Sequence, residues 1–147
     1  TGTSLMDLYR KTVLDHSRQP HNCRRPETFD REAEGHNALC GDKVHVYLRL
    51  QADTLADVAY EASGCAISLA SASMMSDAVA GKSVPAAHQT IDELMSGLYG
   101  AQPGQLHCEL AALGGARDYP SRIRCATLPW QTLRAALDAV EETVTTE

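Results

Sequence analysis

The sequence predicts an α+β fold in which helices pack on one face of a small antiparallel sheet. Two segments, residues 43–50 and 55–62, alternate apolar and polar residues with the period of a strand. Several other segments repeat their apolar residues with the period of a helix and end near a glycine or a proline. At 147 residues the chain is long enough to bury one core of its own. We therefore expect residues 1–147 to form a single domain.

The first helix is predicted to begin at Ser4 and to end near Ser17. Ser4 and Asp7 have the spacing of a capping box. The apolar residues that follow share one helical stripe: Leu5, Leu8, Tyr9 and Val13. Pro20 closes this segment, because proline cannot continue a helix. Residues 18–39 are rich in Arg, Pro, Asn and Glu, and we expect an irregular connection there.

Residues 43–50 and 55–62 are predicted to form an antiparallel hairpin around a polar turn. In the first strand the inward residues are Val44, Val46, Leu48 and Leu50, and the outward residues are Lys43, His45, Tyr47 and Arg49. In the second strand the residues that share one face are Ala56, Val58, Tyr60 and Ala62. This alternation indicates two strands that are buried on one side only.

Four helical segments follow the hairpin. A helix of small residues starts after Gly64 and ends at Ala80, before a glycine. A second capping box predicts a short helix over residues 90–98, and residues 105–113 are another short candidate. The last helix carries apolar residues at helical spacing, which are Trp130, Leu133, Leu137, Val140 and Val144. Pro129 in this run predicts a kink or a new helix start.

Composition excludes several classes of function. The chain has 13 Lys and Arg against 19 Asp and Glu, a net charge of −6, which argues against a nucleic-acid partner. No apolar run approaches the ~20 residues that span a bilayer, so we expect no membrane association. Five cysteines without secretory features favour reduced thiols over a disulfide framework. The expected location is the reducing cytoplasm.

Three cysteines lie at the ends of predicted elements, where functional sites are often assembled. Gly41 can turn the backbone so that Cys40 and Asp42 point into one space. The helix start beside Cys65 is expected to lower the pKa of its thiol, and Cys125 lies near the start of the last helix. Three thiolates and a carboxylate can hold a tetrahedral metal. Because compact Cys-x-x-Cys pairs are absent, the residues alone leave open whether these cysteines share a metal site or are separately buried.

Nearly the whole chain resembles the IscU/NifU-like family of iron–sulfur cluster assembly proteins. The matching stretches are Leu8-Tyr9-Arg10, Asp15-His16 with Pro20-His21-Asn22, Asn37-Ala38-Leu39-Cys40-Gly41-Asp42, Gly64-Cys65-Ala66-Ile67-Ser68 with residues 70–75, and residues 119–128 with Trp130. The resemblance implies that the metal ligands are Cys40, Asp42, Cys65 and Cys125. It also implies a third strand near residues 30–34, which makes a sheet of about three strands.

Within this family the chain is more similar to the SufU branch than to the IscU branch. Arg124 stands where the IscU branch has a histidine before its third cysteine, and residues 84–113 contain the extra material typical of SufU. A Leu-Pro-Pro-Val-Lys segment, typical of the IscU branch, is absent. His107 and Cys108 imitate the His-Cys pair of IscU, but their surroundings do not match. We expect Cys108 and Cys23 to be incidental.

The resemblance implies a zinc-dependent sulfurtransferase that accepts persulfide sulfur from a SufS-type cysteine desulfurase and serves downstream iron–sulfur assembly proteins. Cys40 would leave the zinc and carry the sulfur, with a histidine of the partner in its place. Arg122 and Arg124 would offset the negative charge of the site. His16 and His21 are candidates for a partner contact. The alternative function is a scaffold that assembles a [2Fe–2S] cluster on the same ligands, and a purely structural zinc site is a weaker third reading because structural sites seldom use Asp.

Overall fold

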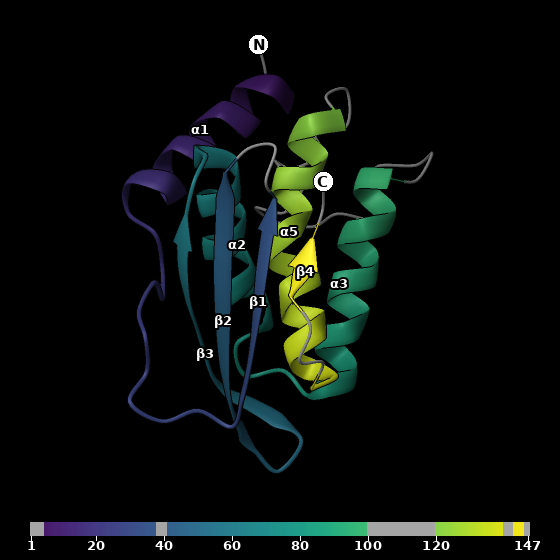
Figure 1. Ribbon diagram of the computed structural model, residues 1–147. Helices are drawn as coiled ribbons and strands as arrows, with labels where there is room; N and C mark the ends of the chain where they lie inside the picture. The colour runs from purple at the N-terminus through teal and green to yellow at the C-terminus, as the bar shows by residue number, and fades with distance from the viewer. Residues whose placement is uncertain (1–4, 38–40, 100–119, 140–142, 146–147) are drawn as a thin grey trace.

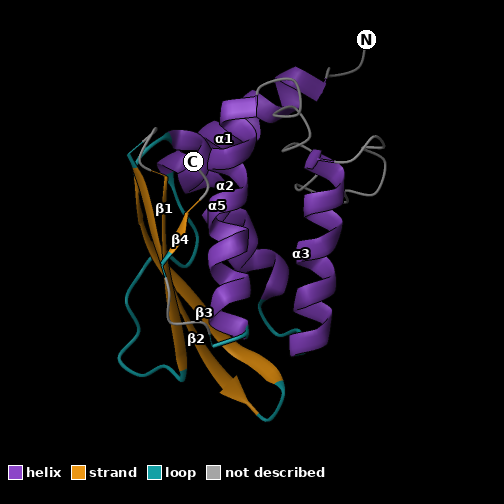
Figure 2. Ribbon diagram, turned by 45° about the vertical axis from the view of Figure 1, so that its right-hand side comes forward, coloured by secondary structure: helices purple, strands orange, loops and turns teal. Residues whose placement is uncertain are grey.

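The computed structural model describes residues 5–37, 41–99, 120–139 and 143–145. Its helices are α1 Leu5–Arg18, α2 Ala66–Val79, α3 Val84–Tyr99 and α5 Pro120–Leu137. Its strands are β1 Arg31–Asn37, β2 Asp42–Gln51, β3 Thr54–Ser63 and β4 Val144–Thr145. Figures 1 and 2 show the described helices on one side of the sheet, which confirms the predicted α+β fold. None of the described helices has the length and apolarity that a membrane span requires.

The sheet has the strand order β3-β2-β1-β4 and is mixed, because β4 pairs in parallel with β1 while the other two pairings are antiparallel. The prediction that the last helix continues to Val144 is therefore wrong. The helix α5 ends at Leu137, and Ala139 takes a left-handed backbone conformation (φ 56°) that closes it. Val144 instead pairs with Gly35 of β1.

β1 corrects the prediction of an irregular connection over residues 18–39, and it is longer than the strand implied near residues 30–34. Its sequence is mostly polar, and the inward positions are occupied by Ala33, Gly35 and Asn37, so the hydrophobic alternation is weak. Gly35 allows α5 to approach the strand, since a Cβ there would lie 2.2 Å from Thr132 Oγ1. Backbone pairing with β2 along its whole length, together with the close packing of α5, defines this strand in place of a clear apolar alternation.

β2 and β3 form the predicted hairpin, but a β-bulge changes which residues of β3 face inward. Arg49 pairs with Asp57 and the next residue, Leu50, pairs with Leu55, so Ala56 has no residue opposite. Leu55 is therefore fully buried and Ala56 is exposed, contrary to the prediction that Ala56 shares a face with Val58 and Tyr60, which are buried. The bulge moves the inward position by one residue at the start of β3.

Tyr47 of β2 is also buried, although the alternation predicts it on the outer face. It does lie on that face, but Phe29 covers it at 5.0 Å between ring centroids and His45 stacks on it at 4.4 Å. Its hydroxyl donates a hydrogen bond to Glu61 Oε1. Burial, and then this bond to the carboxylate, raise the pKa of Tyr47 to about 12. The outer face of the sheet is thus partly covered by the chain that leads into β1.

α2 lies at the centre of the helical layer, and small residues let it pack closely against its neighbours. Four of its serines are buried, at positions 68, 71, 73 and 76. The buried indole N–H of Trp130 on α5 donates to Ser71 Oγ at 2.9 Å, and Ser71 Oγ donates to the carbonyl of Ala126. These buried hydrogen bonds join the two helices and hold α5 against α2.

α3 begins earlier than the predicted capping box at residues 90–93, which lies inside the helix. Ser83 is the actual cap, because its hydroxyl accepts the N–H of Ala86 at 3.2 Å, and Pro85 suits the first turn. Thr90 instead bonds back to the carbonyl of Ala86 at 3.0 Å. The helical candidate at residues 105–113 lies outside the described residues.

Candidate metal centre

Three of the four predicted ligands lie together at one end of the sheet. Asp42 opens β2, Cys65 directly precedes α2, and Cys125 lies in the second turn of α5. One ligand atom from each, two sulfurs and a carboxylate oxygen, lie within 4.8 Å of one another. The antiparallel pair Lys43 and Ser63 brings the start of β2 beside the end of β3, so the fold itself produces this convergence. Cys40 lies outside the described residues.

The carboxylate of Asp42 is fully buried and held in one orientation. Its Oδ1 accepts the backbone N–H of Cys65 at 2.7 Å, while its Oδ2 lies 3.5 Å from Cys65 Sγ and accepts the thiol hydrogen. One oxygen is therefore bound to the main chain, and the other faces the sulfur. This arrangement suits a carboxylate that binds a metal through a single oxygen.

Gly64 makes this contact possible. A Cβ at this position would lie 2.2 Å from Asp42 Oδ1 and 2.7 Å from Asp42 Cα, and the backbone has φ +127°. Only glycine fits both the space and the conformation. Sequence reasoning treated Gly64 as part of a motif and missed its role against Asp42, because that role depends on a neighbouring strand.

Cys65 is the N-cap of α2, and its sulfur accepts the N–H of Ser68 at 3.4 Å. The expectation that the helix start lowers the pKa of this thiol is wrong for the chain without metal. Burial raises the pKa of Cys65 above its ordinary value, and the opposing bond from Ser68 is the smaller effect. The desolvation of a half-buried thiolate outweighs the helix end.

The donor set fits a tetrahedral metal ion. With Zn–S bonds of about 2.3 Å and a Zn–O bond of about 2.1 Å, a tetrahedral zinc separates its sulfur and oxygen ligands by about 3.6 Å. The distance between Cys65 Sγ and Asp42 Oδ2 is 3.5 Å, and Cys125 contributes a second, buried sulfur. Two soft ligands and one hard ligand in a buried setting are typical of a zinc or iron site.

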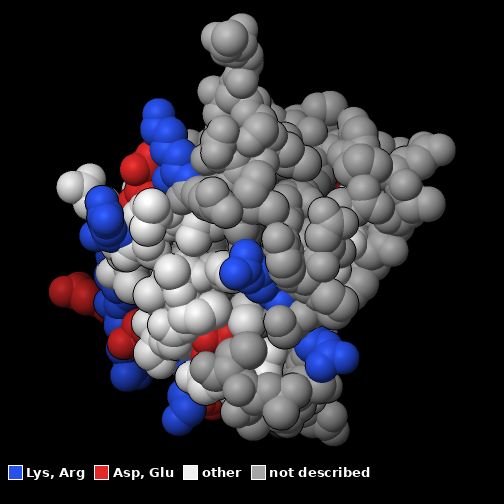
Figure 3. All heavy atoms as spheres, turned by 90° about the horizontal axis from the view of Figure 1, so that it is seen from above, with Lys and Arg blue, Asp and Glu red and all other residues white. Residues whose placement is uncertain are grey.

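The other residues considered from the sequence lie apart from this cluster or at its rim. Arg122 and Arg124 are exposed on the first turns of α5, next to Cys125, and their effect on the charge of the site stays a prediction. Cys23 is exposed and forms a backbone bridge with Tyr60, while Cys108 lies outside the described residues. Seen from above, the described Lys and Arg side chains are spread among acidic and uncharged ones and form no single basic patch on this face (Figure 3).

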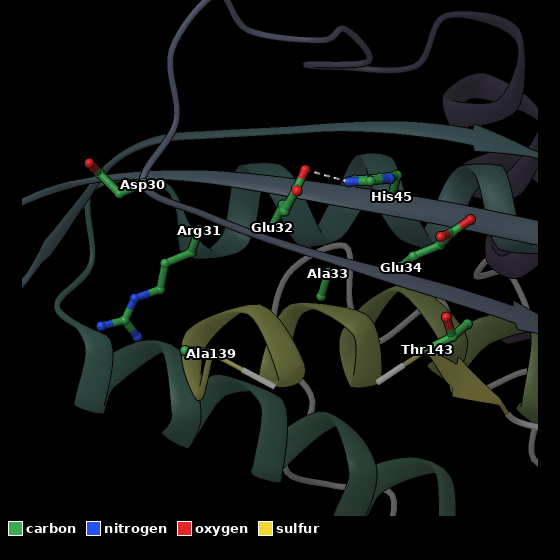
Figure 4. A pocket seen from close by; sticks show the side chains of 8 residues that line it. All are labelled: Asp30, Arg31, Glu32, Ala33, Glu34, His45, Ala139 and Thr143. Carbon is green, nitrogen blue, oxygen red and sulfur yellow. Dashed lines mark hydrogen bonds and ion pairs between the residues drawn. The ribbon is translucent and has the colours of Figure 1, made fainter. Parts of the chain in front are cut away.

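A separate pocket of about 460 Å³ lies along β1 (Figure 4). Acidic side chains and one histidine line it, and His45 Nε2 lies 3.0 Å from Glu32 Oε2. None of the three described ligands borders this pocket. The candidate metal centre is therefore a buried cluster between element ends and is distinct from the open hollow on the sheet.

A family model described as "NifU-like N terminal domain" matches residues 8–126. The chain belongs to this family. The match begins within α1, ends in the second turn of α5 and includes all four predicted ligand positions. The resemblance inferred from the sequence is confirmed.

Two relatives of the NifU-like family are similar to the chain over most of its length. The iron–sulfur cluster assembly scaffold protein IscU of Streptococcus pyogenes serotype M1 is 35% identical over 92% of this chain and 86% of its own. The zinc-dependent sulfurtransferase SufU of Bacillus subtilis is 34% identical over 90% of each chain. In structure, an iron–sulfur cluster assembly scaffold protein for the SUF system from Fervidobacterium islandicum superposes with a TM-score of 0.81 at 30% identity, covering 88% of this chain and 96% of its own.

Proposed function

We propose that the chain is an iron–sulfur cluster assembly protein that acts as a zinc-dependent sulfurtransferase and accepts persulfide sulfur from a cysteine desulfurase. The observation that carries this proposal is the convergence of Asp42, Cys65 and Cys125, whose ligand atoms lie within 4.8 Å of one another, with 3.5 Å between Cys65 Sγ and Asp42 Oδ2. The similarity to a SufU named a zinc-dependent sulfurtransferase supports the choice of metal and reaction. The proposed location is the cytoplasm, with a SufS-type desulfurase upstream and iron–sulfur assembly proteins downstream.

Cys40 is the proposed fourth ligand. It lies outside the described residues, but it is two positions from Asp42 in the chain. Covalent geometry alone keeps the two Cα atoms within about 7 Å of each other. Gly41 between them has φ +72°, which turns the backbone directly before β2. The proposed ligand set is Cys40, Asp42, Cys65 and Cys125.

The residues of the cluster divide into three that stay and one that reacts. Asp42 is held by the N–H of Cys65, Cys65 caps α2, and Cys125 is buried in α5. Cys40 is the proposed ligand that is released, with a histidine of the partner in its place. Bound zinc would keep the thiols deprotonated at neutral pH.

In the proposed transfer, the Cys40 thiolate attacks the outer sulfur of the desulfurase persulfide. A new S–S bond forms on Cys40 as the S–S bond of the desulfurase persulfide breaks, and the desulfurase cysteine leaves as a thiolate. The outer sulfur moves with its hydrogen, so the step needs no external oxidant or reductant. Asp42, Cys65 and Cys125 would be the residues that hold the metal during this step.

The test is stimulation of a cognate cysteine desulfurase by the purified chain. Cys40→Ala, or removal of metal with a chelator, should abolish the stimulation, because the sulfur acceptor or its activation is lost. Cys23→Ser is the matched control, since Cys23 is an exposed thiol outside the cluster. Unchanged stimulation by Cys40→Ala would overturn the proposed mechanism.

A second candidate function is a scaffold that assembles a [2Fe–2S] cluster as its cargo on the same residues. The relative named as a scaffold protein, IscU of Streptococcus pyogenes, favours it, and a carboxylate among thiolates suits a cluster that is passed on. Elemental analysis of protein purified without oxygen distinguishes the two. Colourless protein that contains zinc and no sulfide supports the transferase, whereas brown protein with iron and sulfide supports the scaffold.

A further inference from the structure

A second group of side chains with metal-binding chemistry lies at the other end of α2. His16 in the last turns of α1, His21 in the following loop and Asp77 near the end of α2 bring one ligand atom each within 4.8 Å of one another. The two imidazole rings are 4.7 Å apart between centroids and tilted by 53°. Among the described residues, this group and the cysteine cluster are the two places where such side chains converge in threes.

Buried serines of α2 hold the two histidines. Ser73 Oγ lies 2.7 Å from His16 Nδ1 and accepts the backbone N–H of His21 at 2.8 Å. Ser76 Oγ lies 3.3 Å from the carbonyl of His21. One helix therefore fixes both the ring of the buried His16 and the backbone that carries His21.

The carboxylate of Asp77 is oriented by the same loop. Its Oδ1 accepts the side-chain amide of Asn22 at 3.1 Å, and its Oδ2 contacts Nδ1 of His21. Asn22 has φ 60°, a left-handed conformation that asparagine adopts more readily than most residues. The amide of Asn22 also donates to Ser76 Oγ at 3.0 Å. Hydrogen-bonded partners of this kind orient the ligands in known metal sites.

The group is also open on one side. His16 is 4% exposed, whereas the side chains of His21 and Asp77 are 51% and 44% exposed. A hollow of about 160 Å³ adjoins the histidines, and Thr12, Asp15 and Gln19 complete its lining. Since a water molecule takes about 30 Å³, this hollow has room for the waters that complete a coordination shell.

An ordinary ion pair does not account for this arrangement. The described residues include two pairs of that simpler kind, His45 with Glu32 and His88 with Asp138, each at 3.0 Å and each made of one histidine and one carboxylate. Figure 4 shows the first of them, in which the carboxylate of Glu32 faces the imidazole of His45. At α2 a second, buried imidazole joins the pair, and this third ligand distinguishes the group.

We propose that His16, His21 and Asp77 form a second metal site, which binds a divalent transition-metal ion such as Zn²⁺ or Fe²⁺. Two imidazoles and one carboxylate are the ligands that such ions prefer when sulfur is absent, and they leave further positions for water. The site lies about 18 Å from the cysteine cluster, the rise of the 12 residues between Cys65 and Asp77 along α2. It does not depend on the proposed sulfur transfer.

The experiment uses the full chain without a polyhistidine tag, loaded first with one Zn²⁺ to fill the cysteine cluster. When Co²⁺ is then titrated in, the chain should bind one Co²⁺ ion in addition to the Zn²⁺. Because this site has no sulfur, the bound Co²⁺ should give d–d absorption without a sulfur-to-metal charge-transfer band. Mg²⁺, which prefers oxygen ligands, should not compete.

Substitutions locate the second ion. His21→Ala and Asp77→Asn should each lower the affinity of the chain for this Co²⁺ ion by at least tenfold. Both side chains are exposed enough to be replaced without loss of the fold. His88→Ala is the matched control, because it removes a histidine of similar ion-pair geometry elsewhere on the surface. A zinc-loaded chain that binds no Co²⁺ would overturn the proposal, as would equal Co²⁺ affinities for His21→Ala and His88→Ala.

Discussion

The two ends of α2 carry ligand clusters that are held in opposite ways. At the start of the helix, Asp42, Cys65 and Cys125 come from three elements, and backbone N–H groups bind two of them. The N–H of Cys65 donates to the carboxylate of Asp42, and the N–H of Ser68 donates to the sulfur of Cys65. At the end of the helix, His21 and Asp77 lie at the surface, and the side chains of Ser73 and Asn22 hold them. The cysteine cluster therefore depends on the backbone of the fold, whereas the histidine cluster depends on surface side chains.

This difference decides how a substitution acts. A cluster held by the backbone should lose its geometry only when the backbone itself is disturbed, and the fold should then be damaged as well. A cluster held by exposed side chains should lose its ligands one by one while the fold persists. Substitutions made in pairs, one at each end of α2, test this distinction.

Gly64→Ala should have the largest effect. The new Cβ would meet both the carboxylate and the backbone of Asp42, at 2.2 and 2.7 Å, at a backbone angle that alanine rarely adopts. We expect the free energy of unfolding to fall by about 3 kcal/mol and zinc binding at the cysteine cluster to be lost. Urea denaturation and a zinc competition titration measure the two effects.

Gly81→Ala is its matched control at the other end of α2. Gly81 also has a positive φ, +79°, but a Cβ there would meet nothing within 4 Å. Only the backbone strain remains, so the loss should be about 1 kcal/mol with zinc binding unchanged. Equal losses for the two variants would mean that Gly64 does not position Asp42.

Much of the fold was predictable because local patterns determine it. Alternation identified β2 and β3, and the glycine after α2 marked its end. Two of the failures arose from tertiary structure. The bulge at Ala56 depends on how two strands pair, and the burial of Tyr47 depends on Phe29 from a distant loop. Val144 repeats the helical spacing by coincidence, since Ala139 has already ended α5.

The two clusters also differ in how well the sequence predicts them. Cysteines at element ends are chemically distinctive, so Cys65 and Cys125 could be selected before their positions were known, whereas the role of Gly64 could not. His16 and Asp77 are separated by 61 positions in the chain, and no motif connects them. Only the packing of α1 on α2 brings them together. Whether either cluster binds metal stays a prediction.

Asp42→Asn should have the next largest effect, and it acts on binding alone. An asparagine can still accept the N–H of Cys65, but its amide would face the sulfur in place of a charged oxygen. We expect zinc affinity at the cysteine cluster to fall about 100-fold, or about 2.7 kcal/mol. Competition with a chromophoric chelator measures it.

Asp77→Asn, the partner substitution, should leave zinc affinity at the cysteine cluster unchanged. It should change the free energy of unfolding by only about 0.5 kcal/mol, because its ion pair with His21 is exposed. A large loss of zinc at the cysteine cluster in this variant would contradict the independence of the two ends.

Ser71→Ala and Ser73→Ala compare the middle of α2 with its end. Loss of the Ser71 hydroxyl leaves the buried indole N–H of Trp130 without its acceptor, which should cost about 2 kcal/mol. Loss of the Ser73 hydroxyl should cost about 1 kcal/mol: the N–H of His21 lies in a partly exposed loop and can bond to water, while the ring of the buried His16 also loses its bond to Ser73 Oγ. Unfolding followed by the fluorescence of Trp130, the single tryptophan, measures both. A larger loss for Ser73→Ala would reverse the comparison.

Ser68→Ala should have the smallest effect and the opposite sign. The Ser68 hydroxyl is fully buried and finds no hydrogen-bond partner within the described parts of the chain, although Ser71 and Ser73 on the same helix are both bonded. A buried hydroxyl without a partner destabilises the folded state, so its removal should raise the free energy of unfolding of the metal-free chain by about 1 kcal/mol. The backbone N–H of Ser68, which bonds to Cys65 Sγ, is unaffected by the change. If Ser68→Ala instead lowers both stability and zinc affinity, a side chain of α2 also supports the cysteine cluster, and the main chain is not its sole support.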